Sequence, residues 1–214
     1  MYRFAFALAF AALILLLTMP VKAEEEAQDG KLRLIVSTTQ IYDFVRQVVG
    51  DRCEVECILE AGANPHSYNP TPGDARKVIA SDICFQNGLH LEGSNWMATL
   101  AKDAGKPIIT CTDGIETLEL EYGGKKVSDP HAWFSPKHAA VYVNNVTREM
   151  IRFDPDGEQE YKLRASLYLQ QLRALDSWIR KTMNSLPVQK RILVTSHGRR
   201  QLLMPSTGSR TRLR

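Results

Sequence analysis

The sequence predicts an α/β fold: a lobe with a parallel sheet and covering helices, a long linking helix and the beginning of an incomplete second α/β lobe. Three observations support this. Short apolar stretches alternate with segments of helical periodicity between residues 32 and 111. Apolar side chains then recur at steps of three or four along residues 157–185. A last apolar stretch, residues 192–195, begins a new unit. Strands that alternate with helices form crossover units, which makes the sheet parallel.

The first lobe is expected to hold four strands with helices between them. The strands are predicted at residues 32–38, 55–59, 83–85 and 107–111. A first helix should end at Gly50, because glycine commonly stops a helix. A second should begin after Thr71, which can cap it, with Pro72 in the first helical position. A third is expected over about residues 93–104.

The remainder of the chain is expected to contain two more helices and one strand. Pro136 opens a helix that Asp154–Gly157 breaks, and the longest helix then runs from about residue 157 to 185 before Pro187. These boundaries predict a lobe over 24–153, a linking helix over 154–187 and the start of a truncated second lobe over 188–198.

The N-terminus has the pattern of a secretory signal peptide. Arg3 precedes an apolar run over residues 4–19, and Ala23 follows a small residue at the −3 position, which predicts removal of residues 1–23. The alternative, an uncleaved anchor, conflicts with a run shorter than the ~20 residues that span a bilayer. No cysteine lies at the cleavage point. The mature protein is therefore expected in the periplasm or another extracytoplasmic space.

Charge argues against nucleic-acid binding. The chain has a net charge of +3, but residues 24–198 carry 20 basic and 24 acidic side chains. The basic excess comes from residues 199–214, which hold five arginines and no acid. This tail has no sustained period and is predicted to be disordered. The acidic body does not have the basic face of a nucleic-acid binder.

Four cysteines, Cys53, Cys57, Cys84 and Cys111, leave two interpretations open. An oxidising compartment permits disulfides. Cys53 and Cys57 are too close along one strand to pair, since positions i and i+4 lie ~13 Å apart in an extended chain. Cys84 and Cys111 could form a bridge or remain buried thiols. The spacing does not indicate a cysteine-based zinc site.

Three histidines, His66, His131 and His197, lie in loops far apart in the sequence, two of them just after predicted strands. Imidazole is a common ligand of zinc and also serves manganese and iron. Ligands from separate loops suit a site assembled by tertiary structure. His90 lies in the loop after the third predicted strand and His138 at the start of a helix, and neither is expected to bind metal. Asp129 could orient a ligand histidine or simply form a turn.

The residues around these histidines resemble a known family. Residues 64–72, Asn-Pro-His-Ser-Tyr-Asn-Pro-Thr-Pro, and residues 129–136, Asp-Pro-His-Ala-Trp-Phe-Ser-Pro, are similar to two motifs of the solute-binding proteins that carry zinc and manganese for ABC transporters. Asn87-Gly88-Leu89 with Glu92, and residues 194–197, Val-Thr-Ser-His, match at the expected order. The resemblance covers about residues 32–198.

The resemblance implies two α/β lobes joined by a long helix, with a metal held between them by His66, His131 and His197. The family's fourth ligand is a late Asp or Glu, which has no counterpart here. We therefore expect a C-terminally truncated member whose tail replaces the second lobe. The implied function is capture of Zn(II) or Mn(II), with Fe as a third candidate, for a membrane permease. The chain is expected to be a monomer, and some family members are associated with cell adhesion.

Two observations on the metal point in opposite directions. Residues 119–128 contain no histidine, which argues against the histidine-rich loop of zinc-specific members. A histidine as third ligand favours zinc over manganese. Two alternative functions remain: a non-functional fragment, and a secreted metallohydrolase. The second needs a general base beside the metal, and the sequence has no His-Glu-x-x-His helix. We therefore predict that the protein is not an enzyme.

Overall fold

The computed structural model describes residues 30–117, 119–122, 125–195 and 210–213. The chain divides into two units, Met1–Lys31 and Leu32–Arg214, and every element named below belongs to the second. The predicted signal peptide, residues 1–23, lies outside the described residues. Within those ranges, no helix is both long enough and apolar enough to cross a bilayer.

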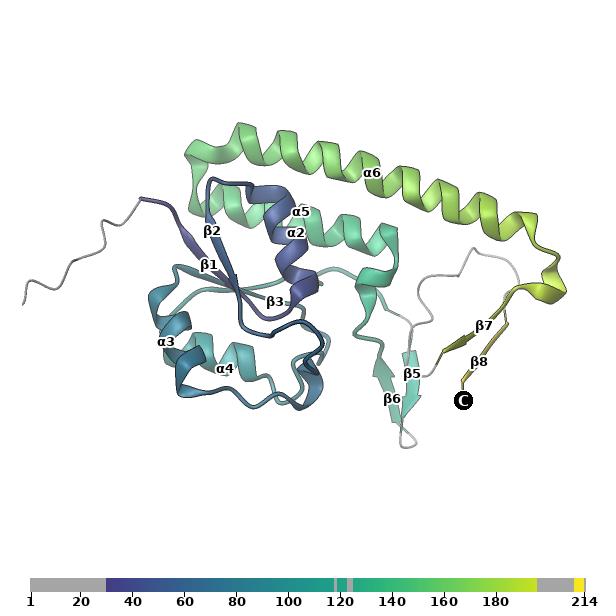
Figure 1. The fold of residues 1–214 in the computed structure, drawn as a ribbon, viewed down its shortest axis with the longest axis horizontal. Coiled ribbons are helices and arrows are strands. Elements are labelled where there is room, and N and C mark those ends of the chain that lie inside the picture. Colours follow the sequence, from purple (N-terminus) through teal and green to yellow (C-terminus); the bar gives the residue numbers. More distant parts are fainter. Residues whose placement is uncertain (1–29, 118, 123–124, 196–209, 214) are drawn as a thin grey trace, which may run out of the picture. The chain divides into compact units, whose positions relative to one another are not determined.

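A four-stranded parallel sheet forms the centre of the lobe, in the order β2-β1-β3-β4 (Figure 1). The strands are β1 Arg33–Val36, β2 Glu54–Cys57, β3 Ile83–Gln86 and β4 Ile108–Thr110. In the register, Leu34 of β1 pairs with Val55 on one side and with Ile83 on the other. The predicted parallel sheet is confirmed, and its strands fall where the sequence places them.

Helices cover both faces of this sheet, so the central strands are buried on both sides. One core contains Leu34, Val36 and Phe85, and the other contains Ile35 and Cys84. The first core lies under α2 Thr39–Val49, α5 Pro136–Phe153 and α6 Glu158–Ser185. The second lies under α3 Pro72–Ala80 and α4 Trp96–Asp103, on the opposite side of the strands from α6 in Figure 1. Two-sided burial explains the nearly continuous apolar strands.

The ends of the first helices follow from local sequence. Thr38 precedes α2, and its side chain accepts a hydrogen bond from the backbone N–H of Ile41. Gly50 ends α2 with φ 57°, a left-handed conformation that glycine adopts without steric cost. Before α3, Thr71 and Asp74 form a capping box, each side chain accepting from the other residue's backbone N–H.

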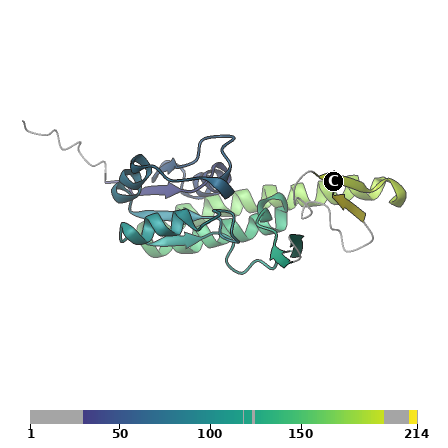
Figure 2. The same cartoon turned by 90° about the horizontal axis from the view of Figure 1, so that it is seen from below.

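The helices α5 and α6 run side by side in both views (Figures 1 and 2). They are separated by a short 3₁₀ turn, η3 Pro155–Gly157. Tyr161, Ala165 and Leu172 of α6 are buried against the first core at the three- or four-residue steps that the sequence shows. The predicted long helix is confirmed almost to its ends.

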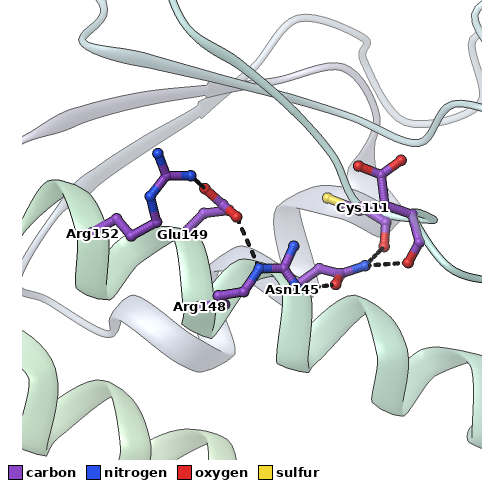
Figure 3. A network of polar contacts seen from close by, with 6 residues as sticks. Cys111, Asn145, Arg148, Glu149 and Arg152 are labelled. Atoms are coloured by element: carbon purple, nitrogen blue, oxygen red, sulfur yellow. Dashed lines mark hydrogen bonds and ion pairs between the residues drawn. The ribbon is translucent and has the colours of Figure 1, made fainter.

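A buried amide attaches α5 to the segment that follows β4. The Asn145 Nδ2 group donates to the carbonyl oxygens of Cys111 and Asp113, both at 2.9 Å (Figure 3). Its Oδ1 accepts from Arg148, which with Glu149 and Arg152 forms a chain of ion pairs along the helix. Asn145 is therefore satisfied on both sides of its amide.

Two strand pairs were not predicted. A hairpin of β5 Glu119–Tyr122 and β6 Lys125–Ser128 lies between β4 and α5, where no strand is expected from the sequence. The pair Gly123–Gly124 in the sequence follows alternating apolar and polar residues and is a hairpin signal, but Lys125 and Lys126 interrupt the alternation after it. Farther on, β7 Ile192–Thr195 is the expected strand, and it pairs in parallel with β8 Arg210–Leu213. The described part of the tail thus differs from the predicted disorder, while residues 199–209 lie outside the described residues.

The proposed bridge between Cys84 and Cys111 does not form. Cys84 packs in the core beneath α3 and α4, whereas Cys111 packs in the core beneath α2 and α5. Because the two thiols face opposite sides of the sheet, they cannot meet. All four cysteines are free, so the alternative of free thiols holds.

Candidate metal centre

His66 lies in the loop beyond β2, on the 3₁₀ turn η1 Pro65–Ser67. The side chain of Asn64 accepts a hydrogen bond from the His66 backbone N–H at 3.0 Å and so caps this turn. The Trp96 indole N–H donates to the Pro65 carbonyl at 3.1 Å. The backbone of His66 is thus held from both sides, while its ring is half-buried.

His131 comes directly before a second 3₁₀ turn, η2 Ala132–Phe134, and is 7% exposed. The Asp129 Oδ1 atom lies 3.0 Å from the His131 backbone nitrogen and 2.7 Å from its Nδ1 atom. Because a carboxylate accepts, Nδ1 carries the proton and Nε2 keeps its lone pair. Asp129 could orient a ligand histidine or simply form a turn, and this contact supports the orienting role.

The two imidazole rings lie close together although they are far apart in the sequence. Their centroids are 5.7 Å apart, with an interplanar angle of 66°. A zinc–nitrogen bond is about 2.1 Å, which places each ring centroid about 3.2 Å from a shared ion. At a tetrahedral angle the centroids would then lie about 5.2 Å apart, rising to about 6.4 Å if the ligands were opposite. The observed separation falls within this range.

Both rings line one cleft of about 250 Å³. Its wall also includes Thr38 at the start of α2, Leu59 beyond β2, and Trp133. The Trp133 ring packs edge-on against His131, with centroids 5.2 Å apart. The cleft lies beyond the carboxyl ends of the strands, as expected for a parallel sheet.

Glu92 is buried beneath this region and does not line the cleft. Its Oε1 accepts from the Ser37 hydroxyl at 2.8 Å and from the Asn87 N–H at 2.7 Å. Its Oε2 accepts from the Gly88 N–H at 3.0 Å. Burial raises the pKa of Glu92, and these hydrogen bonds oppose that rise. Glu92 therefore organises the loop after β3 and is no metal ligand in this arrangement.

Neither His90 nor His138 lines this cleft. His90 is exposed in the loop after β3, and His138 is half-buried on α5. His197, the third predicted ligand, lies outside the described residues. Among those described, no group of three or more His, Cys, Asp or Glu side chains is arranged to hold a metal. The structure thus brings together two of the three predicted ligands.

One known protein family matches the range that contains both the lobe and the histidine motifs. The family model for "Zinc-uptake complex component A periplasmic" matches residues 34–210. The chain belongs to this zinc-uptake component family. The match includes both histidine loops and extends past residue 198, where the resemblance of the motifs ends.

Curated relatives of this chain are components of metal transporters. The metal ABC transporter substrate-binding lipoprotein SsaB of Streptococcus sanguinis is 30% identical over 89% of this chain and 66% of the relative. The manganese ABC transporter substrate-binding lipoprotein PsaA of Streptococcus pneumoniae is 31% identical over 90% of this chain and 64% of the relative. The chain thus spans just under two thirds of the length of these proteins.

Solved structures of the family have the same fold. A manganese-bound, singly substituted form of a periplasmic metal binding protein from Candidatus Liberibacter asiaticus is 30% identical with a TM-score of 0.76, over 86% of this chain and 68% of that one. The periplasmic zinc binding protein TroA of Treponema pallidum is 26% identical with a TM-score of 0.75, over 86% and 66%. The proteins named here are binding and transport components, and none is an enzyme.

Proposed function

We propose that this chain is the extracytoplasmic substrate-binding component of a metal-ion ABC transporter. It captures Zn(II) or Mn(II), with Fe as a third candidate, and delivers the ion to a membrane permease. The single observation that carries the proposal is the meeting of the His66 and His131 rings, 5.7 Å apart, in one cleft. The curated relatives, which are metal-transporter lipoproteins, support it.

The ligand set consists of His66, His131 and His197. His131 presents its Nε2 lone pair because Asp129 holds the opposite side of the ring. Capture needs only reversible ligation, so no general base or nucleophile is required. Neutral imidazole binds zinc and other borderline divalent ions. The exported location, the permease partner and the monomeric state belong to the same proposal.

Replacing either cleft histidine should abolish tight binding. We expect calorimetry on the full chain to show binding of zinc or manganese. His66→Ala and His131→Ala should each lower the affinity by more than the about 10- to 100-fold that loss of an outer-shell partner costs. The matched control is His90→Asn, which removes an exposed imidazole outside the cleft, at φ 61°, a conformation that asparagine tolerates.

The control variant should bind like the unmodified chain. Loss of binding in His90→Asn alone, or equal binding by all four proteins, would contradict the assignment of the cleft. A well-folded unmodified chain that binds neither ion would contradict the function itself.

A further inference from the structure

The loop between β3 and α4, residues 87–95, contacts the backbone of both histidine loops. We propose that this β3–α4 loop sets the separation of His66 and His131, with Asn87 and Gly93 as its positioning residues. The inference rests on the proposed function, because the separation matters only if the two rings share an ion. Neither positioning residue lines the cleft.

Asn87 connects the loop to the second histidine. Its Nδ2 group donates to the Pro130 carbonyl at 3.1 Å, directly before His131. Its Oδ1 accepts from the Tyr142 hydroxyl at 2.5 Å, and its backbone carbonyl accepts from the Thr112 hydroxyl at 2.6 Å. Asn87 is fully buried. Tyr142 of α5 thus fixes the side-chain amide that donates to Pro130, and Thr112, just beyond β4, fixes the Asn87 backbone.

Gly93 connects the same loop to the first histidine. A methyl group added at Gly93 would overlap the His66 carbonyl oxygen and lie 2.9 Å from its carbonyl carbon. The two backbones are therefore in direct contact, with no room for a side chain. Gly93 also has φ +48°, a conformation that favours glycine.

The loop between these two contacts is held in an unusual conformation. Among the described residues, the non-glycine residues with positive φ are Leu89, His90 and Asn95, and all three lie in this loop. Such a conformation persists only where the surroundings impose it. Glu92 supplies that constraint, because its carboxyl group accepts from Ser37 outside the loop and from Asn87 and Gly88 within it. A rigid loop in contact with both histidine segments fixes their spacing.

Two pairs of variants test the proposal. Asn87→Ala is matched by Asn145→Ala, which removes another buried amide that donates to two carbonyls, those of Cys111 and Asp113. Gly93→Ala is matched by Gly105→Ala, which places alanine at φ +64° with no atom within 4 Å of the added methyl group. Each control variant makes the same kind of change as the variant it is matched with, loss of a buried amide or alanine at positive φ, but at a site that does not contact a histidine loop.

The first measurement is made on the metal-free full chain. In the unmodified protein we expect a nuclear Overhauser effect between ring protons of His66 and His131. Asn87→Ala and Gly93→Ala should weaken or remove this effect, while Asn145→Ala and Gly105→Ala should keep it. Should Asn87→Ala fail to fold, Asn87→Asp retains an acceptor for Tyr142 and loses the donor to Pro130.

The second measurement is the dissociation constant for zinc alone, which should rise about tenfold or more in Asn87→Ala and Gly93→Ala relative to their controls. An unchanged ring contact in both variants, or its equal loss in the controls, would overturn the role of the loop. If the ring contact responds as expected but the unmodified chain binds neither zinc nor manganese, the loop sets the geometry as proposed and the metal-capture function is wrong.

Discussion

At the scale of single residues, the contact between Asp129 and His131 uses one ring nitrogen to orient the imidazole and leaves the other available. The carboxylate holds both the backbone nitrogen and Nδ1 of His131. It therefore fixes the direction of the ring and the tautomer through Nδ1, and it leaves Nε2 for the ion of the proposed site. Asp129 is fully buried, so water does not replace it readily.

Removing this carboxylate should weaken metal binding without abolishing it. We expect Asp129→Ala to reduce zinc affinity by about 10- to 100-fold. Asp129→Asn should lose less, because an amide oxygen still accepts from Nδ1. Calorimetry on both variants checks this order. Affinity in Asp129→Ala equal to that of the unmodified chain would show that the carboxylate serves only the turn.

The cysteines give a second prediction at this scale. Burial raises the pKa of Cys84 and Cys111, and it raises the pKa of Cys57 to about 11, which keeps these thiols protonated and slow to react near neutral pH. A thiol reagent should therefore react slowly with the native chain and count four thiols after unfolding. A count of two after unfolding without reductant would indicate a disulfide and contradict the finding that all four cysteines are free.

The sequence could predict His66 and His131 but not the residues that position them. The histidines lie in motifs with distinctive neighbours. Asn87 and Gly93, by contrast, act through contacts with Pro130 and the His66 backbone, which depend on the packing of separate loops. Leu89 and His90 have positive φ angles, a left-handed backbone conformation that costs a non-glycine residue about 1 to 2 kcal/mol. Such conflicts between local preference and fold are typical of functional sites.

At the scale of elements, a polar cluster connects the start of α6 to the sheet lobe. Asp154 accepts from the Arg52 guanidinium at 2.5 and 2.9 Å and from the Tyr161 hydroxyl at 2.5 Å. The hydrogen bond from Arg52 holds the pKa of Asp154 below its usual value. A side chain at Gly157 would collide with this cluster. The cluster therefore fixes where α5 ends and α6 begins.

Asp154→Asn should destabilise the fold in a pH-dependent way. At pH 7 we expect a loss of about 1 to 2 kcal/mol, limited because the Arg52 side chain is 34% exposed. Since the folded pKa is lowered, the contribution is present above the unfolded value of about 3.9 and is lost as the pH falls through the folded pKa. Denaturant unfolding should be measured at pH 7 and near pH 3. The difference in the free energy of unfolding between the unmodified chain and Asp154→Asn should be smaller near pH 3.

The matched control for this cluster is Asp176→Asn. Asp176 pairs with Arg180 four residues later on the same helix, with both side chains partly exposed. Such a pair contributes about 0.5 kcal/mol or less. Equal losses from Asp154→Asn and Asp176→Asn at pH 7 would show that the cluster does not anchor α6.

The elements differ in how well the sequence predicted them. The long helix α6 repeats its apolar step many times, so its bounds were predicted almost to the residue. The hairpin of β5 and β6 has only four residues in each strand, and in such short strands the alternation of apolar and polar residues is weak evidence. The missed hairpin lies just before Asp129, so the connection that leads to His131 could not be described correctly from the sequence.

At the scale of the whole molecule, the fold follows from a sheet buried on two faces. Alternate residues of β1 and β3 supply two cores, and helices cover both. Because both faces of the sheet are covered, the cleft is formed by loops beyond the ends of the strands. Both cleft histidines come from loops that follow strands, His66 beyond β2 and His131 beyond the hairpin. His197 follows β7 in sequence, and its position lies outside the described residues.

The most direct test of the central claim is the position of a zinc ion in crystals of the full chain. Anomalous scattering at the zinc edge should give one peak in the cleft, about 2.1 Å from the Nε2 atom of His131 and a similar distance from a ring nitrogen of His66. A peak bound by only one of these rings, or zinc only at sites outside the cleft, would contradict the account.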